Sequence, residues 1–170
     1  MSMRALQALA AVGVAAIIAG IWCAVPAAAD QNWGINGTFA TSSNGDWAKV
    51  NQRYQDQPSE RETWTISTQC ISPSECTGTV QSDAGWTAPI YTTNSIWYLK
   101  RTIPNWRFCA DGAPIEGFQE YMIYPVGSID GHVDLASDEY TGQNRVIGPS
   151  GSCGRNQPPV IQMPFYMKKL

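Results

Sequence analysis

The chain has 170 residues, enough for one domain once a targeting segment is set aside. Arg4 is the only charged residue among the first 29, so the remainder carries ten basic and 14 acidic side chains and a net charge of −4. The charges are scattered, without the basic cluster that binding to nucleic acid or an anionic membrane surface requires, which argues against both as partners.

The N-terminus has the layout of an export signal. Arg4 precedes a run over residues 5–25 that is apolar except for Gln7, and small residues follow up to Ala29. This pattern predicts a signal helix that is cleaved after Ala29, giving a signal peptide at residues 1–29 and a secreted domain at residues 30–170. The alternative is a retained membrane anchor, since an apolar run of this length can span a bilayer. In either case we expect the protein outside the cytoplasm, secreted, periplasmic or associated with the cell wall.

Alternating side chains predict strands along the rest of the chain, and no helical period is present. In residues 64–70, Trp64 and Ile66 alternate with Thr65 and Ser67, the period of two that a half-buried strand requires. We expect strands at residues 37–40 and 47–50, paired as a hairpin, and at 64–70, 76–81, 89–91, 96–103, 118–126, 131–136 and 160–168. Residues 140–159, with four glycines and three prolines, are expected to form a long loop.

These segments predict an all-β fold. The short turns between consecutive strands imply antiparallel neighbours. The expected architecture is therefore a single antiparallel barrel of seven or eight strands, a lipocalin-like meander that hides its edges by closing, with a sandwich as the alternative.

The cysteines predict disulfides. Cys23 falls in the signal segment, and the four that remain form an even set in an exported chain. Three pairings are possible. Cys70 and Cys76 flank the turn of an expected hairpin, so we favour the pair Cys70–Cys76, which leaves Cys109–Cys153. A metal site is disfavoured, because the cysteine spacing does not suit zinc and the chain has one histidine; no cofactor is expected.

No catalytic constellation is recognisable. His132 is the only histidine and lies in an expected turn, without a nucleophile elbow elsewhere in the chain. Acidic residues gather nearby, but their spacing fits no calcium loop; they are Asp130, Asp134, Asp138 and Glu139. The sequence therefore does not predict an enzyme.

Four side chains are candidate ligand contacts: Trp86, Tyr91, Arg101 and Trp106. Arg101 shares a strand face with Trp97 and Leu99, so it is expected inside the barrel or at its mouth, where it needs a partner or could bind an acidic ligand. Tryptophans on loops of a rigid scaffold are common binding anchors, although they also close barrel ends as ordinary core. We expect a binding module for a small molecule, an envelope polymer or an envelope protein. The alternative is an accessory subunit of an envelope complex without a pocket.

Spaced landmarks over residues 33–170 carry a resemblance. They are Gly37-Thr38-Phe39, Trp64 leading into Ser67-Thr68-Gln69-Cys70, Glu75-Cys76-Thr77-Gly78, Trp97-Tyr98, Trp106 before Cys109, Cys153-Gly154 and Met163-Pro164-Phe165. The chain resembles mycobacterial and related actinobacterial exported proteins of unknown function. It is also similar to the extracytoplasmic domains of some mycobacterial Ser/Thr protein kinases. These 170 residues contain no kinase domain, so the resemblance implies an extracytoplasmic β domain and transfers no functional residue.

Overall fold

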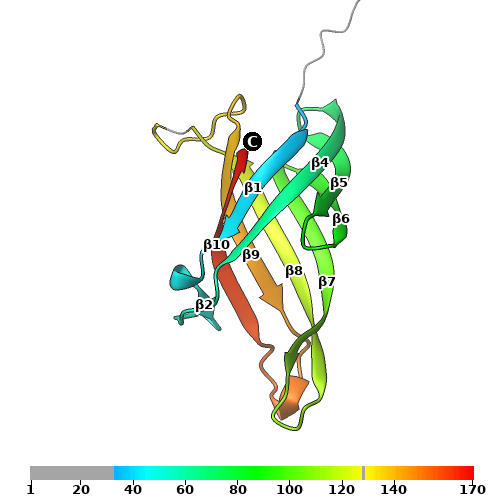
Figure 1. Cartoon of the computed structure of the whole chain (residues 1–170), viewed down its shortest axis with the longest axis vertical. Coiled ribbons are helices and arrows are strands. Elements are labelled where there is room, and N and C mark those ends of the chain that lie inside the picture. The colour runs from blue at the N-terminus through cyan, green and yellow to red at the C-terminus, as the bar shows by residue number, and fades with distance from the viewer. Residues whose placement is uncertain (1–32, 128) are drawn as a thin grey trace, which may run out of the picture. The chain divides into compact units, whose positions relative to one another are not determined.

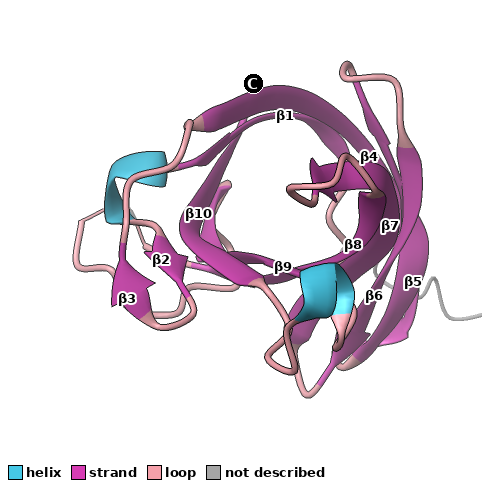
Figure 2. Ribbon diagram, turned by 90° about the horizontal axis from the view of Figure 1, so that it is seen from below, coloured by secondary structure: helices cyan, strands magenta, loops and turns pink. Residues whose placement is uncertain are grey.

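The computed structural model describes residues 33–127 and 129–170, and the expected signal segment lies outside them. Eight strands form a closed antiparallel barrel in which each strand pairs with the next and β10 returns to β1 (Figure 2). They are β1 (Gly37–Ser43), β4 (Glu60–Ser72), β5 (Glu75–Ser82), β6 (Thr87–Thr93), β7 (Ile96–Phe108), β8 (Pro114–Pro125), β9 (Glu139–Ile147) and β10 (Val160–Lys169). The prediction of an all-β barrel is confirmed, and the sandwich alternative is wrong. Within the described ranges no helix is long and apolar enough to cross a membrane.

A short excursion interrupts the ring after β1. The chain leaves β1, forms the 3-10 turn η1 (Gly45–Trp47) and rejoins the edge of β10 as β2 (Lys49–Val50) before β3 (Arg53–Tyr54), so these elements lie outside the ring in Figure 2. The predicted pairing of residues 37–40 with 47–50 is therefore wrong, because both segments pair with β10 instead. Gly45 permits the excursion, since a Cβ there would lie 1.8 Å from the Gln57 carbonyl oxygen.

Alternate side chains fill the barrel. Trp64 is 1 % exposed and lies at the centre, stacked on Phe165 at 5.2 Å between ring centroids and edge-on to Tyr121 at 4.9 Å. The other large core side chains, all nearly inaccessible, are Ile35, Phe39, Ile66, Val80, Ile90, Trp97, Leu99, Ile123 and Met167. Burying such side chains contributes about 1.5–3 kcal/mol each, so this core stabilises the barrel and occupies the place a lipocalin would leave for ligand.

Two segments differ from the sequence prediction. Residues 131–136 were expected as a strand but lie in a loop, and β9 occupies the first half of the expected loop 140–159. In β9 the inward positions include Gly142 and Asn144. Because these residues are not apolar, the sequence lacks the alternation of apolar and polar residues that indicates a strand. In the loop, Val133 and Leu135 alternate with polar residues as they would in a strand, but both are exposed. The alternation therefore does not mark a buried face.

Both predicted disulfides are present. Cys70–Cys76 links directly opposed residues of β4 and β5, with the Cα atoms 4.0 Å apart. Cys109–Cys153 links the turn after β7 to η2 (Ser152–Gly154), with the Cα atoms 5.2 Å apart. The second bridge ties the β7–β8 turn to the β9–β10 connection, which lie together at the lower end of Figure 1.

Candidate functional site

Two of the four predicted contact residues lie against each other. The Arg101 guanidinium carbon is 4.2 Å from the centre of the Trp86 ring, a cation–π contact. Arg101 Nε donates a hydrogen bond of 2.6 Å to Gln119 Oε1, its cross-strand partner. Trp86 also packs edge-on against Trp64, at 5.4 Å between ring centroids. The Arg101 side chain thus points to the inside of the barrel, as the sequence predicted. There it contacts the Gln119 amide and the Trp86 ring.

A polar network continues from Arg101 across the barrel. Gln119 Nε2 donates to Asn144 Oδ1 at 2.9 Å, and Asn144 Nδ2 donates to Ser43 Oγ and Glu60 Oε2, both at 3.0 Å. Gln119 and Asn144 are 1 % and 0 % exposed, so these bonds satisfy amides that would otherwise be costly to bury. Partial burial of its carboxyl group and the nearby charge of Glu62 raise the pKa of Glu60.

Glu62 joins the same network from the neighbouring inward position of β4. Its carboxylate accepts hydrogen bonds from Trp64 Nε1 at 2.8 Å, Ser82 Oγ at 2.6 Å and Trp86 Nε1 at 3.4 Å. Trp86, which lies in the turn between β5 and β6, thus has a structural partner in the Glu62 carboxylate. That Trp86 and Arg101 contact a ligand stays a prediction.

Tyr91 and Trp106 lie elsewhere. Tyr91 is on β6, with its ring stacked on Tyr98 at 5.9 Å. Trp106 packs with a small second cluster of buried residues and covers Gly117 and Gly148, where a Cβ would lie 2.7 Å and 3.3 Å from the indole. The two glycines make room for the ring, so Trp106 closes this side of the core. The four predicted residues therefore fall in three places.

A cavity of about 460 Å³ lies beside the Cys109–Cys153 disulfide. Its walls come from the end of β7 and the start of β8, from residues 152–159, and from Asn51 in the turn between β2 and β3. Its lining includes the side chains of Arg107, Phe108, Ile115, Arg155 and Pro159. Sequence reasoning missed this site.

Backbone hydrogen bonds and the disulfide fix the cavity walls. Cys109 N donates to the Ala113 carbonyl at 2.9 Å, and Gly151 N donates to the Arg155 carbonyl at 3.0 Å, so each side of the cavity is a tight turn. Asn51 Oδ1 accepts a hydrogen bond of 2.9 Å from Val160 N and thereby anchors the third wall. The cavity is therefore largely preformed, as small-molecule sites usually are.

Neither arginine of the cavity forms an ion pair with an acidic side chain within residues 33–127 and 129–170. The described residues form three ion pairs, and neither Arg107 nor Arg155 takes part in them. Arg107 Nη2 donates to Gln57 Oε1 at 3.3 Å, and its guanidinium carbon lies 5.1 Å from the Trp106 ring centre. One carboxylate, that of Asp111, also lines the cavity, and it accepts a hydrogen bond from Ala113 N at 3.0 Å.

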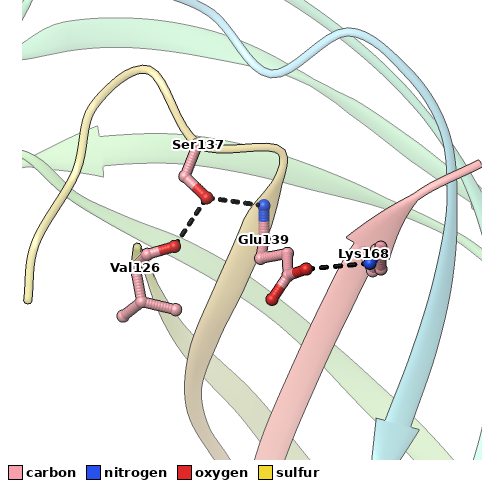
Figure 3. A network of polar contacts seen from close by, with 4 residues as sticks. All are labelled: Val126, Ser137, Glu139 and Lys168. Carbon is pink, nitrogen blue, oxygen red and sulfur yellow. Dashed lines mark hydrogen bonds and ion pairs between the residues drawn. The ribbon is translucent and has the colours of Figure 1, made fainter. Parts of the chain in front are cut away.

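The opposite end of the barrel carries the loop of residues 129–138, at the upper end of Figure 1. Figure 3 shows how its base is anchored: Ser137 Oγ donates to the Val126 carbonyl at 2.5 Å and accepts from Glu139 N at 3.0 Å. Glu139 in turn pairs with Lys168 Nζ at 2.8 Å, which holds the pKa of Glu139 below its ordinary value.

The residues weighed for chemistry in this loop have local roles. Asp130 and Asp134 accept hydrogen bonds from the backbone N–H groups two residues further along, at 3.1 Å and 2.9 Å. His132 is exposed. Among the described residues no group of three or more His, Cys, Asp or Glu side chains is arranged to hold a metal ion.

Comparison with known proteins places the fold. No protein-family model matches the chain, and the search of curated proteins finds no match. Among solved structures, the chain is similar to the monomer form of the M. tuberculosis PknI sensor domain, with a TM-score of 0.55 and 16 % sequence identity over 80 % of this chain and 87 % of that one. The chain therefore shares its fold with the PknI domain, which confirms the resemblance to the extracytoplasmic domains of mycobacterial kinases. At this identity the likeness concerns the fold alone.

Proposed function

We propose that the protein is a non-catalytic extracytoplasmic binding module that holds a small ligand in the cavity beside Cys109–Cys153. The observation that carries this proposal is the contrast between a barrel filled by its own core and an open, preformed cavity of about 460 Å³ at one end. Small-molecule sites typically measure about 300–1,000 Å³ and combine apolar walls with a few polar groups. The cavity has this size and composition.

The covalent chemistry of the domain supports a place outside the cytoplasm. Two disulfides in one domain are typical of proteins that fold in an oxidising environment outside the cytoplasm. The similarity to a sensor domain supports the same location. A secreted or envelope-associated protein, with residues 1–29 as its export signal or anchor, accounts for both observations.

A second candidate function is an accessory subunit that binds an envelope protein. The observation that favours it is the loop at the other end of the barrel, where Ile129, Val133 and Leu135 are 99 %, 67 % and 77 % exposed. Exposed apolar side chains gathered in one loop are typical of contact surfaces between proteins. The two candidates use opposite ends of the barrel, so variants can separate them.

The test is a titration of the oxidised domain with the apolar fluorescent probe N-phenyl-1-naphthylamine. We expect one binding site, and we expect Ala110→Trp to abolish it, because Ala110 is an exposed residue that lines the cavity and the indole would fill the space. Phe118→Ala is the control, since Phe118 lies outside this cavity and is 47 % exposed. Binding that survives Ala110→Trp would contradict the proposal, and so would the absence of binding both by this probe and by its anionic counterpart 1-anilinonaphthalene-8-sulfonate.

A further inference from the structure

We propose that the cavity recognises an amphiphilic organic anion, whose carboxylate, sulfate, sulfonate or phosphate group binds between Arg107 and Arg155. This inference rests on the proposed function and names the class of ligand. The two arginines occupy equivalent places relative to the disulfide: Arg107 precedes Cys109 by two residues, and Arg155 follows Cys153 by two. The bridge therefore brings both side chains to the same cavity from segments far apart in the sequence.

No ion pair that the structure describes neutralises the positive charge of the two cavity arginines. None of the three ion pairs in the described part of the chain includes either arginine, and Asp111 is the single carboxylate among the residues that line the cavity. The lining thus carries two positive charges and one negative charge, in a domain whose net charge is negative. A bound oxyanion would supply the missing counter-charge.

The geometry of Arg107 suits such a role. Its guanidinium is held by a hydrogen bond to the neutral Gln57 side chain and by contact with the Trp106 ring, and neither contact uses up its charge. A guanidinium has five N–H donors, and one of them is engaged by Gln57. Donors that remain can bind an oxyanion bidentately, the geometry in which arginine is most selective.

The apolar part of the ligand has a place beside the arginines. Phe108 lines the cavity and is 66 % exposed, and Ile115 and Pro159 also line it. Covering an exposed phenyl ring with an apolar group removes both surfaces from water, which favours binding. A free inorganic anion would leave this surface uncovered, and a neutral apolar molecule would leave the arginines without a counter-charge.

The experiment compares two probes that share one ring skeleton. 1-Anilinonaphthalene-8-sulfonate carries a sulfonate that N-phenyl-1-naphthylamine lacks, so the ratio of their dissociation constants isolates the contribution of the anion. We expect the sulfonate to bind about tenfold more tightly, the size of effect that one charge-assisted contact gives. Arg107→Gln and Arg155→Gln should each weaken sulfonate binding about tenfold and leave the neutral probe within about twofold.

Arg61→Gln is the matched control, because it makes the same charge change at an exposed position of β4 outside the cavity. It should alter neither affinity, and near-ultraviolet circular dichroism of each variant checks that the core is intact. Equal affinity for the two probes, or sulfonate binding that ignores both cavity arginines, overturns the anion preference while leaving the proposed function standing. Failure of both probes to bind, or binding of both that survives Ala110→Trp, overturns the proposed function and this inference together.

Discussion

The two disulfides should contribute unequally to stability. The bridged cysteines are separated by 44 residues in Cys109–Cys153 and by 6 in Cys70–Cys76. A crosslink stabilises mainly by restricting the unfolded chain, and the chain-entropy relation for loops of these lengths gives about 4 kcal/mol for the long link and about 2 kcal/mol for the short one. Replacing both cysteines of a pair by serine should lower the free energy of unfolding by these amounts.

The native structure reinforces this order. Cys70 and Cys76 are directly opposed in the β4–β5 hairpin, whose ladder and short turn already hold them together. The segments that carry Cys109 and Cys153 belong to different connections, so this bridge supplies a tie that no single hairpin replaces. The long link should also matter for the cavity: Cys109→Ser/Cys153→Ser should weaken probe binding, and Cys70→Ser/Cys76→Ser should leave it unchanged.

Guanidinium chloride unfolding at pH 7, followed by tryptophan fluorescence, measures the loss of stability, and titration of the same samples with the probe measures the loss of binding. The two double variants serve as controls for each other, because each loses one disulfide and two sulfur atoms. Equal losses of stability, a larger loss for the short link, or unchanged probe binding after removal of Cys109–Cys153 would refute the reasoning.

Two further predictions concern the barrel wall. Glu60→Gln should stabilise the domain at pH 7: the raised pKa of Glu60 means that the folded state favours the protonated carboxyl, so ionisation costs stability as pH rises above the ordinary value of 4.5. Gln keeps the acceptor for Asn144, and denaturant unfolding at pH 7 and pH 3.5 should show the gain at pH 7 and its loss in acid. Gly142→Ala should lower the free energy of unfolding by about 3 kcal/mol through overpacking, because its Cβ would lie 1.8 Å from the Met122 carbonyl oxygen. Gln143→Ala at the exposed neighbouring position is the control. An unchanged denaturation midpoint for Gly142→Ala would contradict the prediction.

The sequence predicts the barrel where its pattern and its burial agree. In β4 the apolar side chains of Trp64 and Ile66 alternate with polar ones, and both are buried. The same segment gives the Cys70–Cys76 pairing, because a hairpin with cysteines at its turn places them opposite each other. Here the local pattern and the tertiary structure require the same arrangement, so the sequence alone is sufficient to predict the strand and the disulfide.

The pattern fails where the interior of the barrel is not apolar. Asn144 and Gly142 face inward in β9, and their roles depend on groups distant in sequence: Ser43 and Glu60 for the amide, and the Met122 carbonyl for the glycine. No window of sequence contains those partners. An inward glycine or amide therefore looks like a loop residue until the neighbouring strands are in place.

The candidate cavity could have been predicted in part. Once Cys109 is paired with Cys153, the segments that carry Arg107 and Arg155 are joined by the same bridge, since each arginine is two residues from its cysteine. The sequence does not show that the two arginines line an open space. It also does not show that the Trp106 indole closes the core beside that space, because this depends on the packing of the indole against Gly117 and Gly148. The sequence contains those glycines, but nothing local shows what fills the space beside them.

Trp106 links the stable part of the domain to the cavity. One side of the indole packs on the second buried cluster and seals the core, and the Arg107 guanidinium lies at 5.1 Å from the ring. The same ring therefore contacts both the buried cluster and the guanidinium of a residue that lines the cavity. A filled barrel is what makes this arrangement possible, because a rigid core can hold loop residues in a fixed geometry without itself changing shape. In this fold the ligand site is thus expected on the tied loops, where sequence can vary without disturbing the core.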